Sequence, residues 1–284
     1  MVRAPSLYLG GSWFESKGAD MEKPELFSGA AEYYAKYRPG YPKAFFDFVR
    51  KEFCLNGIGR HLDLGCGTGQ IAIPLAKDFE EVIGLDPDSE MLREAKKQAR
   101  KAEVKNIRWV LGKAEEMSQT LGSFRLVTLG ASFHWMDNQA SVLRTLYQMT
   151  ERGGGIVLTH NPSSGWRKMN EEWKKVRKRV VQKYLGTKRR AGNSFYREKE
   201  KRWEDVLNAS PFGKHKKWRY AYPLSWTIEE VIGYLYSTSF ASRRLFGDKL
   251  LVFEKELRSE LLRIEPSGVF SEKVTLETLV AHKR

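Results

Sequence analysis

The segment HLDLGCGTGQIAIPLA, at residues 61–76, constrains the fold more than any other part of the chain. An apolar run ends at Leu64, and three glycines follow at alternating positions, Gly65, Gly67 and Gly69, before a helical pattern begins. Glycine suits these positions because the chain must turn sharply and let a ligand lie against the backbone, where a Cβ would intrude. The pattern therefore predicts a strand, a glycine-rich turn and a helix, with a ligand at the turn.

The first 160 residues alternate between apolar clusters and helical stretches. Buried strands are predicted where the chain is continuously apolar, at residues 61–64, 82–85, 107–111, 126–129 and 156–159. Helices are predicted between or before them, at residues 29–36, 42–53, 74–79, 89–102 and 139–149. Such alternation predicts an α/β fold with a doubly wound, mostly parallel sheet.

This alternation stops after residue 160. Residues 161–250 carry many aromatic side chains among Lys and Arg, and helices are expected at residues 169–184, 198–208, 228–236 and 249–263. The closing stretch, residues 273–284, alternates well enough to be a last strand. The expected organisation is a flexible leader at 1–20, a ligand-binding core with N-terminal lid helices at 21–160, a cap at 161–250, and a C-terminal helix and final strand of the core sheet at 251–284.

The spacing of the glycines bears on which nucleoside the turn would bind. A dinucleotide-binding turn reads G-x-G-x-x-G, whereas this chain reads G-x-G-x-G and has Gln70 where the third glycine would stand, which disfavours NAD. Asp86 ends the second predicted strand and can accept hydrogen bonds from both hydroxyls of a ribose. In an alternative role, Asp86 only caps the helix that starts near Ser89.

Residues 27–160 resemble the class I S-adenosylmethionine-dependent methyltransferases. Asp63 matches the acidic residue that this family places beside the methionine ammonium of the cofactor, and Ala114 and Glu115 stand where the family frames the adenine. The SFHWMD stretch at residues 132–137 matches a His-Trp pair of the trans-aconitate-methyltransferase-like branch. The same branch has a Y-x-x-x-R-P-x-Y-P signature, which begins here at Tyr34.

The resemblance implies a Rossmann-like methyltransferase fold with a helical cap inserted after the fifth strand, and S-adenosylmethionine as the cofactor. The residues it implies for cofactor binding are Tyr34, Arg38, Asp63, Gly65, Gly67, Asp86, Ala114, Glu115, Ala131 and Trp135. No metal is expected, because methyl transfer needs none and the five histidines and two cysteines lack zinc-ligand spacing.

Three of the candidate residues have two possible roles each. Arg38 is expected to bind the cofactor carboxylate through two hydrogen bonds, or else to form a surface salt bridge. Trp135 covers the adenine or the sulfonium, or else belongs to the core. His134 is the candidate catalytic residue, because its ordinary pKa near 6.5 suits a general base, or else it is structural.

The formal charge of +14, from 49 Lys plus Arg against 35 Asp plus Glu, favours an anionic partner. We expect a small-molecule acceptor, with basic side chains selecting it if it is anionic, and O or N as the accepting atom. The alternative is a nucleic-acid methyltransferase that tracks phosphates with the basic runs at residues 173–190 and 213–220. A third possibility is a cofactor-binding protein without transfer activity. No apolar run is long enough to cross a bilayer, and we expect a cytoplasmic protein.

Overall fold

The computed structural model describes residues 27–161, 171–191, 194–195 and 201–284. The predicted leader at residues 1–20 lies outside them, as do the first residues of the helices predicted at 169–184 and 198–208.

A seven-stranded sheet forms the centre of the described structure, in the order β3-β2-β1-β4-β5-β9-β8. Its strands are β1 (Arg60–Leu64), β2 (Glu81–Asp86), β3 (Ile107–Leu111), β4 (Phe124–Gly130), β5 (Thr150–His160), β8 (Lys216–Thr227) and β9 (Val269–His282). The first five pair in parallel, and β9 and β8 pair antiparallel. The predicted doubly wound, mostly parallel sheet is confirmed.

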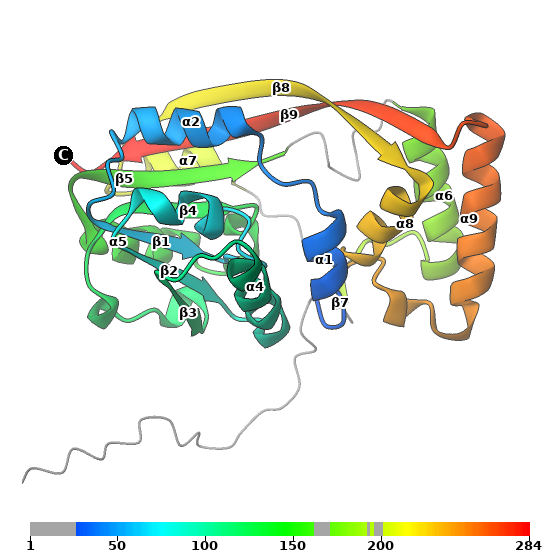
Figure 1. Cartoon of the computed structure of the whole chain (residues 1–284), viewed down its shortest axis with the longest axis horizontal. Coiled ribbons are helices and arrows are strands. Elements are labelled where there is room, and N and C mark those ends of the chain that lie inside the picture. The colour runs from blue at the N-terminus through cyan, green and yellow to red at the C-terminus, as the bar shows by residue number, and fades with distance from the viewer. Residues whose placement is uncertain (1–26, 162–170, 192–193, 196–200) are drawn as a thin grey trace, which may run out of the picture.

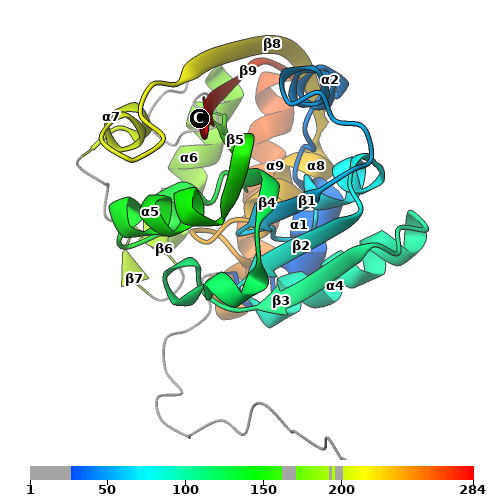
Figure 2. The ribbon, with the colours of Figure 1, turned by 90° about the vertical axis from the view of Figure 1, so that its left-hand side faces the viewer.

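Helices pack on both faces of this sheet. Those around the parallel strands are α2 (Lys43–Glu52), α3 (Ala72–Leu75), α4 (Ser89–Lys101), α5 (Gln139–Met149) and α7 (Trp203–Asn208). Apolar side chains of α2 and α3 form one buried cluster with the sheet, and those of α5 and α7 form another on the opposite face. Figure 2 looks along the sheet and shows α2 apart from α5 and α7.

A second group of helices lies beyond the far ends of β8 and β9, at the right of Figure 1. It comprises α6 (Glu172–Leu185), α8 (Ile228–Tyr236) and α9 (Leu250–Ile264), whose apolar side chains form a third buried cluster. We call these three helices the cap. No described helix is long and apolar enough to span a bilayer.

The predicted cap segment, residues 161–250, also contains strands that the sequence analysis did not predict. These are the short pair β6 (Arg190–Ala191) and β7 (Ser194–Phe195), and the long strand β8. Aromatic and apolar residues alternate along β8 from Trp218 to Trp226 as in a strand, but Pro223 among them indicates a break in regular structure. Proline is tolerated there because β8 is an edge strand and one row of its backbone donors needs no partner.

Helix α1 (Ala31–Tyr37) lies between the parallel strands and the cap (Figure 1). It ends at Arg38, whose extended backbone agrees with the restriction that Pro39 places on the preceding residue. The ring of Tyr37 packs directly on the backbone of Gly233 in α8, where an added Cβ would lie 2.4 Å from ring carbons. The absence of a side chain at Gly233 therefore lets α1 dock on the cap.

We expect Gly233→Ala to destabilise the protein by about 1 to 3 kcal/mol, because Tyr37 must move and overpacking outweighs the better helix propensity of alanine. Chemical denaturation measures the change in the free energy of unfolding. Gly112→Ala is the matched control, since an added Cβ at Gly112 meets nothing within 4 Å. Equal stabilities of the two variants would contradict the proposed contact.

Candidate functional site

The glycine-rich turn joins β1 to α3 and has the left-handed backbone that favours glycine. The φ angles are 68° at Gly65, 52° at Gly67 and 84° at Gly69. An added Cβ at Gly65 would lie 2.4 Å from the Cβ of Ser132. The absence of a side chain at Gly65 therefore lets the loop after β4 pack against the turn. At Gly67 the nearest atom to such a Cβ is Cε1 of Tyr34, at 3.8 Å. The backbone is thus accessible to a ligand at Gly67, between the turn and α1.

Asp86 at the end of β2 is fixed against this turn. Its Oδ2 accepts a hydrogen bond of 2.8 Å from the backbone N–H of Gly67, and its Oδ1 accepts one of 2.9 Å from that of Asp88. The cap of α4 is Asp88, which accepts from the N–H groups of Glu90 and Met91. The alternative role of Asp86 as the helix cap is therefore wrong. Burial raises the pKa of Asp86 to about 6.

Asp63 lies one strand away, beneath the turn, and is 1% exposed. The hydroxyl of Thr128 donates to its Oδ1 at 2.7 Å, and the N–H of Ala72 donates to its Oδ2 at 3.1 Å. Because the Thr128 proton points to Asp63, the buried His61 donates from Nε2 to Thr128 at 2.8 Å. Burial raises the pKa of Asp63 to about 7 and lowers that of His61 to about 3.

No Lys or Arg among the described residues forms an ion pair with Asp63 or Asp86. Two carboxyl groups are thus held in a poorly solvated place by neutral donors alone, on either side of a turn whose backbone a ligand can reach. A ligand that brings a cation and hydroxyl groups would stabilise their ionised forms.

The loops after β3 and β4 meet on one side of the turn. Glu115, in the single turn η2 (Ala114–Glu116), accepts a hydrogen bond of 2.8 Å from the N–H of Asp137, which follows the single turn η4 (Phe133–Trp135). Ala114 is half-buried and Glu115 exposed. The sequence-predicted pair therefore lies where the two loops are joined.

Trp135 is half-buried and lies outside the three buried clusters. The ring of Phe27 lies edge-on to Trp135 and to Tyr34, with centroid distances of 6.0 Å in both cases. These three rings form an aromatic wall that connects η4 to α1 beside the glycine turn.

The guanidinium of Arg38 lies between two aromatic rings, 4.9 Å from the centroid of Tyr34 and 4.8 Å from that of Tyr234. It donates to the carbonyl oxygen of Ser237 at 3.3 Å, and its buried Nε has no hydrogen-bond partner. No described carboxylate pairs with it. Arg38 therefore forms no surface salt bridge within the described part of the chain, where its guanidinium is available to an anion.

Arg38 faces a pocket between the glycine turn and the cap. The pocket is lined from the core side by Tyr34, Arg38, Gln70, Ala131 and His160, and from the cap side by Lys174, Arg177, Trp226, Tyr234 and Glu272. Ala131, at the end of β4, has a φ of 52°, which is uncommon for a residue with a side chain. Tyr222 of β8 also contributes.

The two histidines near this pocket occupy different places. His160, at the end of β5, lines the pocket, whereas His134 is not among its lining residues. The ring of His134 stacks on Trp203 of α7, with centroids 6.1 Å apart, and Trp203 also contacts His160 at 4.4 Å. Burial lowers the pKa of His160, so its imidazole is neutral at pH 7.

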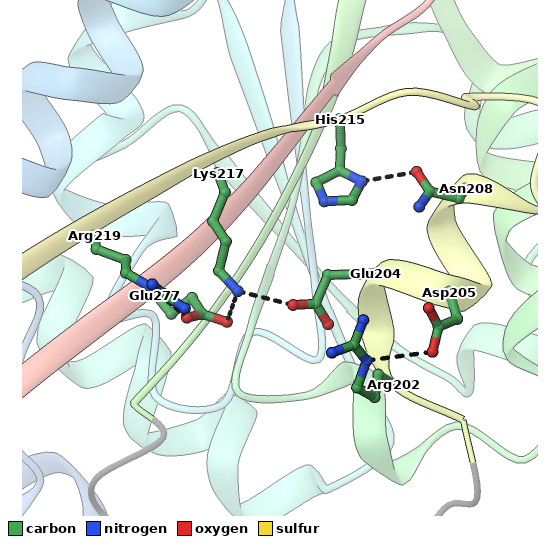
Figure 3. A network of polar contacts seen from close by, with 8 residues as sticks. All are labelled: Arg202, Glu204, Asp205, Asn208, His215, Lys217, Arg219 and Glu277. Carbon is green, nitrogen blue, oxygen red and sulfur yellow. Dashed lines mark hydrogen bonds and ion pairs between the residues drawn. The ribbon is translucent and has the colours of Figure 1, made fainter.

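Ion pairs anchor α7, and with it Trp203, to the antiparallel strands (Figure 3). Lys217 of β8 binds Glu204 at 2.8 Å and Glu277 of β9 at 2.7 Å, and Arg219 binds Glu277 at 2.8 Å. Trp203 is the first residue of α7, next to Glu204, so this network holds it against both histidines.

The sequence analysis did not single out His160, Lys174 or Arg177. His160 follows the fifth predicted strand directly, at the edge where such sheets bind ligands, and this position could have identified it. Lys174 and Arg177 lie in the basic run at residues 173–190 and were treated only as members of that run. Both are buried, and Lys174 pairs with Glu171 and Glu272. Exposed members of the run also pair with carboxylates, Lys175 with Glu172, Arg179 with Glu260 and Lys183 with Glu256.

Metal-ligand geometry is absent from the described part of the chain, where no three His, Cys, Asp or Glu residues gather as a metal site would require.

Comparison with known proteins places these features in context. A family model described as a methyltransferase domain matches residues 62–154. Demethylmenaquinone methyltransferase of Lactobacillus johnsonii is 30% identical over 170 residues, which cover 53% of this chain and 68% of that protein. Trans-aconitate 2-methyltransferase of Deinococcus radiodurans is 33% identical over 105 residues, or 36% of this chain and 38% of the relative. The chain spans less than half the length of several of the curated relatives it matches.

Among solved structures, the chain resembles an S-adenosylmethionine-dependent methyltransferase from Thiobacillus denitrificans in complex with S-adenosyl-L-homocysteine. The TM-score is 0.50 with 14% identity, over 93% of this chain and 100% of that one. At this identity the likeness shows the fold alone.

Proposed function

Because the chain belongs to the class I S-adenosylmethionine-dependent methyltransferases, we propose that it transfers a methyl group to an oxygen or nitrogen atom of a small-molecule acceptor. The observation that carries methyl transfer is the pair of buried carboxyl groups, Asp63 and Asp86, which flank the glycine turn without a cation of their own. The aromatic pocket beside the turn supports a small-molecule acceptor.

The chemistry of these groups fits S-adenosylmethionine, the cofactor of this family. Asp63 would hold the ammonium of its methionine part, Asp86 the ribose hydroxyls and Arg38 the carboxylate. The left-handed Gly67 leaves the backbone open at this place. When bound, the cofactor supplies an electrophilic methyl group on a sulfonium.

The loops after β3 and β4 would enclose the adenosine part. Ala114 and Glu115 would frame the adenine, and Ala131 and Trp135 would lie along its other side. The aromatic wall formed by Phe27, Tyr34 and Trp135 would exclude water, which favours an in-line displacement at carbon.

The acceptor would enter the pocket between the glycine turn and the cap. Its walls of Tyr222, Trp226 and Tyr234 provide apolar surface, and a few polar groups among them would orient a small molecule. The described basic run on α6 supports a nucleic-acid substrate poorly, because three of its exposed cations are already paired with glutamates.

A protonated acceptor atom needs a base, and we propose His134 for this role. Its ring is half-buried beside Trp135, next to the proposed position of the cofactor. His160 is the second candidate, because it lines the pocket and burial lowers its pKa, which keeps its ring neutral.

We expect Asp86→Ala to weaken the binding of S-adenosylhomocysteine at least about tenfold. Each hydrogen bond to a charged acceptor contributes about 1.5 to 3 kcal/mol. Isothermal titration calorimetry measures the affinity. Asp88→Ala is the control, since it removes the cap of α4 and about 1 kcal/mol of stability but should leave binding intact. Unchanged affinity in Asp86→Ala would refute the cofactor site.

The affinity should also depend on pH. In the free protein the pKa of Asp63 is about 7 and that of Asp86 about 6, and a bound ammonium would favour the ionised form of Asp63. Binding therefore releases protons, and affinity should fall as the pH drops from 8 to 5, by up to about tenfold per unit and titrating group. Calorimetry in buffers of different ionisation enthalpy measures the release. A flat profile, or one unchanged by Asp63→Asn, would contradict this.

The two histidines can be separated by substitution. His134→Ala should lower kcat by about 10² to 10⁴ while the affinity for S-adenosylhomocysteine changes less than about threefold, as expected for a lost base. His160→Ala is the matched variant, and methyl transfer to a fractionated metabolite pool gives the rates. A larger loss of kcat in His160→Ala than in His134→Ala would transfer the role to His160.

A further inference from the structure

Arg177 is a buried cation on the apolar side of a helix. Its neighbours on that side of α6 are Trp173, Val176, Val180 and Val181, all of them buried in the cap cluster. Arg177 itself is 6% exposed, and burial lowers its pKa, although it stays charged. Burying a charge costs free energy unless an opposite charge or hydrogen bonds compensate for it. The role of Arg177 therefore depends on which groups surround its guanidinium.

No described carboxylate forms an ion pair or a hydrogen bond with Arg177. The guanidinium lies over the rings of Trp173, at 5.2 Å from the centroid, and of Tyr234, at 5.4 Å. Its buried Nε has no hydrogen-bond partner, and no described carboxylate lies within ion-pair distance. The aromatic faces offset part of the desolvation cost but leave the N–H donors of the guanidinium unused.

The two carboxylates that act on Arg177, those of Glu272 and Glu171, form their contacts with other residues. Glu272 forms an ion pair with the buried Lys174 and accepts a hydrogen bond of 2.7 Å from Nε1 of Trp226. Glu171 pairs with the same lysine at 3.0 Å. Both carboxylates thus contact Lys174 and act on Arg177 only from beyond ion-pair distance, where they raise its pKa, and the guanidinium at the wall of the pocket has no hydrogen-bonded anion.

Arg177 and Arg38 both lie against the ring of Tyr234. Tyr234 is 4.8 Å from the guanidinium carbon of Arg38 and 5.4 Å from that of Arg177, and the pocket is lined by all three. Arg38 follows α1, which contacts the glycine turn through Tyr34, whereas Arg177 belongs to the cap. The cofactor has a single carboxylate, which the proposed function assigns to Arg38, so Arg177 is left for a second anion.

We propose that Arg177 binds an oxyanion group, a carboxylate or a phosphate, of the methyl acceptor, and that this contact selects the substrate. The inference rests on the proposed function. The planar guanidinium can donate two parallel hydrogen bonds to such a group, and between aromatic rings its orientation is already restricted. Arg177 would thus anchor the acceptor at a group other than the one that receives the methyl.

Calorimetry on protein saturated with S-adenosylhomocysteine tests the proposal, with succinate and inorganic phosphate as separate probes. We expect the wild type to bind at least one of them, and the affinity should fall at least tenfold in Arg177→Met. In Arg177→Lys the affinity should fall by less, because lysine keeps the charge but cannot donate two parallel hydrogen bonds. Arg179→Met is the matched control, because Arg179 lies on the same helix, is exposed and pairs with Glu260. It should bind the probe like the wild type.

The affinity for S-adenosylhomocysteine itself separates this proposal from the proposed function. It should change less than threefold in Arg177→Met, and a larger loss would mean that Arg177 serves the cofactor, which overturns the inference. Binding of S-adenosylhomocysteine without binding of either probe, or equal probe affinity in Arg177→Met and the wild type, would also overturn it while leaving the proposed function intact. Without any binding of S-adenosylhomocysteine, the proposed function itself fails.

Discussion

The hydrogen bond from the backbone of Gly67 to Asp86 ties the glycine turn to the neighbouring strand, and the geometry of the site depends on it. It exists because Gly67 adopts a left-handed conformation and because β1 and β2 end at the same edge of the sheet. Together with the bonds from Ala72 and Thr128 to Asp63, it keeps two carboxyl groups in place although burial raises their pKa values. The free protein thus retains a preference for a positively charged ligand at this edge.

The pocket beside the turn shows the same principle with the opposite charge. Arg38 and Arg177 line it among the rings of Tyr34, Tyr234 and Trp173, which lower the cost of burying them but accept no conventional hydrogen bonds. Helix α1 connects the two places, since it contacts the glycine turn through Tyr34 and packs on α8 through Tyr37. A ligand that spans the turn and the pocket and carries both signs of charge is complementary to this arrangement.

Most of the core could be predicted from the sequence, because its signals are local. Buried parallel strands are continuously apolar, and the glycine turn and Asp86 follow them at fixed spacing. Strand β8 escaped prediction since Pro223 is permitted only by its edge position, which is a property of the assembled sheet. The isolation of Arg177 could not be predicted either. It depends on how α6 packs against α8 and α9, and on the pairing of Glu272, almost a hundred residues away, with Lys174.

The chain leaves the parallel strands after His160, and His160 is the direct partner of Glu277 across the antiparallel ladder of β5 and β9. The segment between these two residues therefore begins and ends at neighbouring points, although α7 and β8 within it pack on the core. A change in the length of its cap helices would cost little loop entropy at those points. The matched domain, residues 62–154, ends before this segment, so the cap can vary in sequence and length while that domain keeps its fold.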